Sequence, residues 1–140
     1  ENDAERLAIR ADFSGNQDEF IPAGEYRRLS YNSDVVMSNT PMEIRTCMDF
    51  IERATGHVLI NGLGLGMVLN AVLMKADVTH VTVIEKEQDV INLVAASFAD
   101  DKRVEIICAD AITFAPPAEV TYDVCWHDIW PQFSMGNRLC

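Results

Sequence analysis

From His57 onward, short apolar runs alternate with stretches of helical periodicity. The apolar runs are continuous, which is typical of strands that a parallel sheet buries on both faces. The pattern predicts strands at 58–60, 81–84, 104–108 and 122–126, with helices over about 66–76 and 87–99. Repetition of strand, helix and strand at this spacing predicts an α/β fold with a Rossmann-like, doubly wound and mostly parallel sheet.

The residues before this repeat carry two other patterns. Residues 20–38 alternate apolar segments with turn residues, which predicts a small N-terminal β-hairpin, while residues 1–19 form an acidic arm without apolar periodicity. A helix is expected next, because Pro41 suits a first helical position and Thr40 and Glu43 have the capping-box spacing. Its apolar stripe comprises Ile44, Cys47, Met48 and Ile51.

The expected domains are therefore 1–38, the arm and hairpin, and 39–140, the Rossmann-like domain. Four core strands are fewer than a complete doubly wound sheet requires. We expect a truncated sheet, or one shielded by the hairpin or by a partner chain, since an uncovered edge strand pairs with other chains. Shielding by a second copy would make the protein a homodimer. The chain begins with Glu1 rather than Met, which is consistent with a processed or partial product.

The composition narrows the class of protein. A length of 140 residues with 49% apolar content suits one globular domain, and no apolar run is long enough to span a membrane. Lys and Arg number 11 against 22 Asp and Glu, and the net charge of −11 repels phosphate backbones and anionic lipids. We therefore expect a cytoplasmic protein with a small-molecule partner, without general nucleic-acid binding or membrane binding.

The spacing of the four cysteines indicates no metal site. They are far apart, without a Cys-x-x-Cys pair or zinc-binding histidine spacing, at Cys47, Cys108, Cys125 and Cys140. We expect buried, reduced thiols and no bound metal.

The strongest local signal is the glycine run from Asn61 to Gly66, directly after the first strand and before a helix. Glycines let the backbone turn sharply and approach a ligand closely, and a helix N-terminus offers free N–H groups. A dinucleotide fingerprint would place its third glycine at position 67, which is Met67 here, so an NAD-dependent oxidoreductase is disfavoured. A tight turn that binds no ligand is the alternative.

Acidic residues follow the next two strands. Glu85 ends the second strand and can accept hydrogen bonds from both hydroxyls of a ribose. Asp110 follows the third strand and can bind an exocyclic amine. The carboxyl ends of strands line the ligand crevice of an open α/β sheet, so both acids are expected there. The alternatives are an ordinary exposed acid at Glu85 and a simple turn residue at Asp110.

These residues, in this order, resemble the motifs of class I S-adenosyl-L-methionine-dependent methyltransferases. The similar segments are Gly62-x-Gly64-x-Gly66, Glu85, Ala109-Asp110 and Tyr122-Asp123-Val124, within about residues 56–131. The resemblance implies S-adenosyl-L-methionine as cofactor, with Gly62, Leu63, Gly64 and Gly66 in the cofactor loop. It further implies that Glu85 and Lys86 contact the ribose and that Asp110 and Ala111 contact the adenine.

Within that superfamily, the chain is most similar to the spermidine-synthase branch. The similar segments are Arg103-Val104-Glu105, Asp110-Ala111 and the residues from Tyr122 to Asp128. Two differences disfavour aminopropyl transfer. That branch has an Asp in the glycine loop where this chain has Leu65, and a second acid soon after the position of Asp128, where this chain has none. Carboxylates are needed there to hold and deprotonate a polycationic amine.

Asp128 follows the fourth strand and is the candidate catalytic residue, as a general base or by orienting an amine. Trp126, Trp130 and Phe133 can form a stacking wall beside a sulfonium, or can instead close the core. His127 is adjacent to Asp128, and neighbouring residues on a strand point to opposite faces, which disfavours a His–Asp dyad.

The leading hypothesis is an S-adenosylmethionine-dependent transferase, specifically a methyltransferase on an unidentified small or amine-bearing acceptor. The alternative from another class is a non-catalytic nucleoside-binding or interaction module. The residues after the fourth strand are too few for a further strand and helix, which favours that alternative.

Overall fold

A computed structural model describes residues 25–31, 34–38 and 41–129. The chain divides into two compact units, with the boundary between Glu52 and Arg53. The domain boundary expected at 38/39 remains a prediction. No helix in the described ranges is long and apolar enough to cross a membrane.

The first unit contains the predicted hairpin and most of the predicted helix. Strands β1 (Arg28–Tyr31) and β2 (Asp34–Ser38) pair in antiparallel fashion, which confirms the later part of the hairpin. Residues 1–24 and Thr40, which carry the acidic arm and the expected cap, lie outside the described residues. Helix α2 (Pro41–Arg53) begins at Pro41, as its fixed φ favours.

The apolar stripe of α2 is only partly buried. Cys47 is fully buried, whereas Ile44 and Met48 are 38% and 42% exposed. Helical periodicity correctly placed these residues on one side of the helix, but periodicity alone does not decide how much of a stripe is covered.

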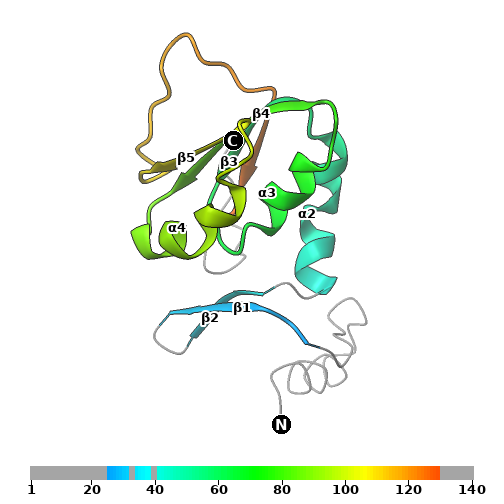
Figure 1. Ribbon diagram of the computed structural model, residues 1–140, viewed down its shortest axis with the longest axis vertical. Helices are drawn as coiled ribbons and strands as arrows, with labels where there is room; N and C mark the ends of the chain where they lie inside the picture. Colours follow the sequence, from blue (N-terminus) through cyan, green and yellow to red (C-terminus); the bar gives the residue numbers. More distant parts are fainter. Residues whose placement is uncertain (1–24, 32–33, 39–40, 130–140) are drawn as a thin grey trace. The chain divides into compact units, whose positions relative to one another are not determined.

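The second unit is a four-stranded parallel sheet, which confirms the predicted fold class (Figure 1). Its strands are β3 (Gly56–Asn61), β4 (Val78–Glu85), β5 (Val104–Cys108) and β6 (Val124–His127), in the spatial order β5-β4-β3-β6. Helix α3 (Met67–Leu73) joins β3 to β4, and α4 (Gln88–Val94) followed by the 3-10 helix η2 (Ala95–Phe98) joins β4 to β5. The link from β5 to β6 has only turns, as its Pro116-Pro117 pair led us to expect.

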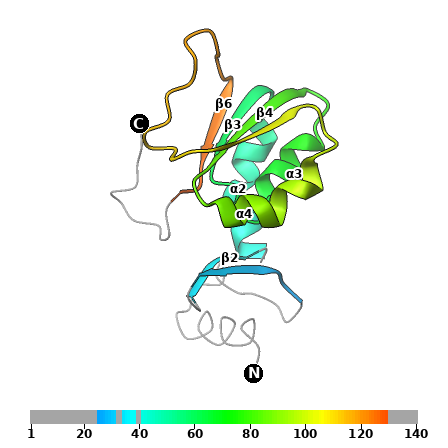
Figure 2. The ribbon, with the colours of Figure 1, turned by 60° about the vertical axis from the view of Figure 1, so that its left-hand side comes forward.

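The central strands carry the core of this unit on both sheet faces, since Thr82 and Ile84, which point away from Val83, are buried as well. Val58, Ile60, Val81 and Val83 are fully buried, and parallel pairing in register places all four on the same face. Two successive crossovers in the same direction put α3 and α4 on one side of a sheet. Figure 2 shows these helices side by side, and α3 supplies buried apolar residues at Val68, Leu69 and Val72.

The strand order creates a switch point between β3 and β6. The chain proceeds from β3 to β4 and β5 in one direction, and then returns to place β6 on the other side of β3. Asn61 and His127, the last residues of β3 and β6, are paired in register at this point. In open α/β sheets, ligands bind outside the carboxyl ends of the strands at such a switch point.

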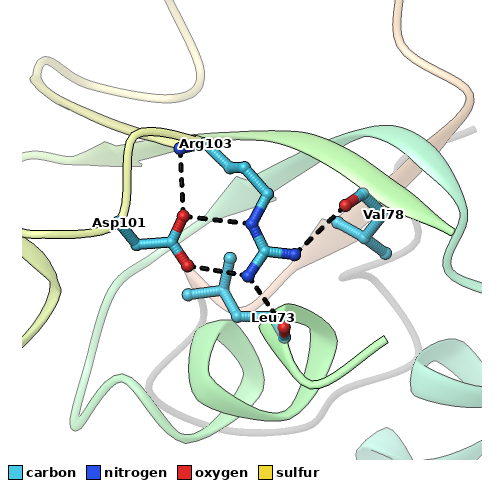
Figure 3. Close-up of polar contacts among 4 residues, drawn as sticks. All are labelled: Leu73, Val78, Asp101 and Arg103. Atoms are coloured by element: carbon cyan, nitrogen blue, oxygen red, sulfur yellow. Dashed lines mark hydrogen bonds and ion pairs between the residues drawn. The ribbon is translucent and has the colours of Figure 1, made fainter. Parts of the chain in front are cut away.

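At the amino ends of β4 and β5, Asp101 and Arg103 form an ion pair, called here the Asp101–Arg103 clasp (Figure 3). The Arg103 guanidinium donates to both carboxylate oxygens of Asp101, at 3.0 Å from Nε and 2.7 Å from Nη2. It also donates to the backbone carbonyls of Leu73, at the end of α3, and Val78, at the start of β4, over 2.9 and 3.2 Å. Hydrogen bonds from Arg103 hold the pKa of Asp101 below its ordinary value. The clasp thus connects the end of α3, the start of β4 and the turn before β5. It also gives a hydrogen-bond donor to the Leu73 carbonyl, which has no partner within the helix because it lies in the last turn.

The thiols differ from the sequence prediction. Cys47 is a buried thiol, as expected, but Cys108 and Cys125 are exposed thiols. Their strands, β5 and β6, are the outer two of the described sheet, so fewer neighbouring side chains cover them. Continuous apolar runs in the sequence do not distinguish outer strands from central ones. Cys140 lies outside the described residues.

Candidate functional site

The glycine loop between β3 and α3 has a left-handed backbone that suits glycine. Gly62, Gly64 and Gly66 have φ angles of +97°, +51° and +75°, in the left-handed region that other residues rarely adopt. The Gly62 N–H donates to the carbonyl of Ile84, and the Gly66 N–H donates to that of Leu63, each over 2.8 Å. The loop therefore has a defined shape, which backbone hydrogen bonds within the loop and to β4 maintain.

Two of these glycines are also required by the packing of the chain itself. A Cβ atom at Gly62 would collide with the backbone carbonyl oxygen of Asp128. A Cβ atom at Gly66 would lie 2.8 Å from the Phe98 ring and 3.1 Å from Val94. The glycine pattern therefore reflects close approach of neighbouring segments as well as any ligand.

Glu85 connects the glycine loop to the next strand. It ends β4 and is only 9% exposed, and its Oε2 accepts the backbone N–H of Leu63 over 2.8 Å. Its Oε1 accepts the N–H of Glu87 over 2.9 Å, and its backbone carbonyl accepts the N–H of Ala109 over 3.0 Å. Glu85 is therefore a buried polar side chain and not an ordinary exposed acid. Its role in holding the loop is one that sequence reasoning missed.

Asp110 is exposed just beyond β5 and organises its own turn. Its Oδ1 accepts the N–H of Ile112 over 2.9 Å, and its backbone carbonyl accepts the N–H of Phe114 over 2.8 Å. This is the turn role that the sequence allowed as an alternative. Among the described residues, no hydrogen bond is made to Oδ2, so that oxygen can accept a further donor.

Asp128 lies beside the first loop glycine. Its N–H donates to the carbonyl of Asn61 over 2.8 Å, which extends the pairing of β6 with β3 beyond the strand end. Its backbone carbonyl is the atom that a side chain at Gly62 would strike. Trp130 and Phe133, the other proposed wall residues, lie outside the described residues.

The predicted site residues thus gather at one edge of the sheet. Glu85 ends β4, and the glycine loop, Asp110 and Asp128 follow β3, β5 and β6 respectively. Parallel strands end at the same edge of a sheet. The backbone bonds of Glu85 and Asp128 link neighbouring loops directly. This edge offers a glycine loop with left-handed φ angles and carboxylate acceptors, which together suit a ligand that carries hydroxyl and amino donors.

A second group of side chains, which sequence reasoning also missed, lies on β3 and β6. The ring of His127 is 2.7 Å from the Asn61 amide at Nδ1, and 3.4 Å from the Cys125 sulfur at Nε2. The sulfur is partly covered, and burial raises the pKa of the Cys125 thiol. The signal available in the sequence was the Cys-x-His spacing on a strand, because residues two apart share a face.

No protein-family model and no curated protein match the chain. Among solved structures, a protein-L-isoaspartate O-methyltransferase is 15% identical, with a TM-score of 0.53, over 89% of this chain and 47% of that one. A spermidine synthase from Thermotoga maritima is 30% identical over 44% of this chain and 23% of that one, with a TM-score of 0.38. A dimethyladenosine transferase from Plasmodium falciparum is 22% identical over 62% and 31%, with a TM-score of 0.49.

The match to the isoaspartate methyltransferase shows that this chain shares the α/β fold of that enzyme. The chain spans less than half of the length of each of these three proteins.

Proposed function

We propose that this chain binds S-adenosylmethionine at the carboxyl edge of its sheet and is the cofactor-binding part of a methyltransferase. The acceptor we propose is a small or amine-bearing molecule. The observation that carries the proposal is the buried Glu85 carboxylate, bonded to Leu63 within the glycine loop. This bond places a hydrogen-bond acceptor directly beside a loop whose glycines have left-handed φ angles.

The available donors and acceptors fit the adenosyl part of the cofactor. Each oxygen of Glu85 accepts one backbone N–H, and a carboxylate oxygen has two lone pairs, so both can also accept a ribose hydroxyl. Oδ2 of Asp110 would accept the exocyclic amine of adenine. Lys86 and Ala111, the residues that follow these acids in the chain, would line the same edge.

The charge of the edge suits a cationic ligand. Glu85, Asp110 and Asp128 are all acidic, and the chain as a whole has a net charge of −11. When bound, S-adenosylmethionine supplies a methyl group on an activated sulfonium. Asp128 would orient an amine acceptor or take up the proton that the amine loses. Transfer to an activated methyl group depends mainly on in-line positioning, which the rigid strand ends can provide.

Calorimetric titration tests the proposal. We expect S-adenosylmethionine and S-adenosylhomocysteine to bind, NAD not to bind, and Glu85→Ala to weaken binding. The matched control is Glu105→Ala, which removes an exposed acid within β5. Binding of NAD alone would exclude this cofactor assignment. Binding without turnover on any pool of acceptors would favour the nucleoside-binding module instead.

A further inference from the structure

Asn61 is the last residue of β3, directly before the glycine loop, and its residue type is unusual for that place. It follows the apolar run 58–60 and is only 4% exposed. Asparagine is depleted in strands, and burying an amide costs free energy unless the amide forms hydrogen bonds. Departures from such local preferences are expected at functional sites. The contacts of Asn61 show what a buried amide provides at this position.

The side-chain amide of Asn61 joins β3 to β6. Its nitrogen lies 2.7 Å from Nδ1 of His127 and donates to the sulfur of Cys125 over 3.8 Å. A neutral imidazole has one donor nitrogen and one acceptor nitrogen. Because the amide nitrogen faces Nδ1, the ring accepts there and carries its proton on Nε2, which lies 3.4 Å from the Cys125 sulfur. One amide therefore fixes both the orientation and the tautomer of the His127 ring.

The backbone of Asn61 holds the segment that follows β6. Its carbonyl oxygen accepts the N–H of Asp128 over 2.8 Å, and the next residue, Gly62, donates its own N–H to the Ile84 carbonyl on β4. A Cβ atom at Gly62 would collide with the Asp128 carbonyl oxygen. The backbone of Asp128 therefore lies directly against the glycine loop, and the pairing of β3 with β6 sets the spacing between them.

We propose that Asn61 is a positioning residue for the cofactor site. Strand β6 has only four residues and, among the described strands, pairs with β3 alone, so a side-chain contact at its last residue, His127, adds to a short ladder. By holding His127, Asn61 fixes the end of β6 and with it the place of Asp128 beside the glycine loop. This inference rests on the proposed function, which assigns the loop to the cofactor and Asp128 to the acceptor. Asn61 acts through His127 and has no chemical part in the transfer.

Calorimetric titration with S-adenosylhomocysteine tests the proposal. Asn61→Ala should weaken binding by about 10-fold, the size of effect expected when a buried hydrogen-bond partner is lost. His127→Ala should weaken it to a similar extent. Because the two residues act through one contact, the double variant should bind no more weakly than either single variant.

Thr82→Val is the matched control. Thr82 is a polar residue of β4 that is 3% exposed, and its hydroxyl lies 2.9 Å from Nε2 of His57 rather than near β6. Its replacement should lower the melting temperature, as Asn61→Ala should, but leave the affinity for S-adenosylhomocysteine unchanged. The comparison separates a loss of positioning from a general loss of stability.

Nitrogen-15 NMR of the histidine rings measures the contact itself, without ligand. At about pH 8, where an ordinary imidazole is neutral, His127 of the wild type should carry its proton on Nε2 alone, and Asn61→Ala should mix the two tautomers. The backbone N–H of Asp128 should also lose protection against hydrogen exchange in Asn61→Ala, but not in Thr82→Val.

The outcomes distinguish this proposal from the proposed function. If Asn61→Ala binds S-adenosylhomocysteine as tightly as the wild type, or if the losses of the two single variants add up in the double variant, the positioning role is wrong and the cofactor assignment stands. A loss of affinity in Thr82→Val as large as in Asn61→Ala also overturns the positioning role. A wild-type chain that binds no S-adenosylhomocysteine overturns the proposed function and this inference with it.

Discussion

Oε2 of Glu85 accepts the backbone N–H of Leu63 across 2.8 Å, although the two residues are 22 positions apart in the sequence. The bond forms because β3 and β4 are parallel neighbours that end at the same edge of the sheet. The shape of the glycine loop and the position of the carboxylate are therefore coupled. Any change at Glu85 should affect the loop as well as a bound ribose.

Glu85→Ala should weaken S-adenosylmethionine binding by about 1–3 kcal/mol, because it removes an acceptor and leaves buried partners without one. It should also lower the free energy of unfolding, since the N–H groups of Leu63 and Glu87 lose their acceptor. Calorimetry and thermal unfolding measure the two effects, with Glu105→Ala as control. An unchanged dissociation constant would contradict the assignment of Glu85 to the ribose.

Gly64→Val should abolish cofactor binding. Gly64 has a φ of +51°, which a β-branched residue adopts only with strain, and the added side chain would occupy the approach to the ligand. Gly62→Ala serves as a comparison for a stability effect. Its new Cβ atom would collide with the Asp128 carbonyl oxygen, so this variant should have a lower melting temperature. A Gly64→Val protein that folds and binds normally would show that the loop does not contact the cofactor.

Gly66→Ala should lower the free energy of unfolding by about 2–5 kcal/mol, from its positive φ and from the contact with Phe98. Phe98→Leu removes the ring atoms that the new Cβ would meet. The double variant should therefore recover part of the loss, which urea unfolding of all four proteins measures. If the changes in the free energy of unfolding caused by Phe98→Leu and Gly66→Ala simply add in the double variant, the packing explanation for Gly66 is wrong.

The Asp101–Arg103 clasp should make stability depend on pH in acid. The pKa of folded Asp101 lies below its ordinary value of 3.8, so the clasp stabilises the fold above that value. This contribution is lost as the pH falls through the lowered pKa and Asp101 becomes protonated.

Melting temperatures of the wild type and of Asp101→Asn should therefore differ most near neutral pH and converge below about pH 4. The neighbouring exposed residue Asp100, changed to Asn, is the control. A difference that stays constant down to about pH 2 would show that the Asp101 carboxylate does not provide the stabilisation.

The alternation of apolar runs and helical stretches predicted all four strands of the second unit, because continuous apolar segments need burial on both faces. The ends of the helices were predicted less accurately from this pattern. Helix α3 ends at Leu73 and not near residue 76, and the second predicted helix changes to the 3-10 helix η2 at Ala95. Helix ends depend on partners such as Arg103, which binds the Leu73 carbonyl from 30 residues away and cannot be located from local pattern.

The sequence by itself determined the fold class, the order of strands and helices, and the placement of Gly62, Glu85, Asp110 and Asp128 at the carboxyl ends of successive strands. These follow from local periodicity and from the rule that parallel strands end at one edge. Only the tertiary structure decided that Glu85 holds Leu63, that Asp110 shapes its own turn, and that Asn61 meets His127 and Cys125. Those contacts depend on which strands are neighbours and on their register, and both are set by packing of the whole sheet.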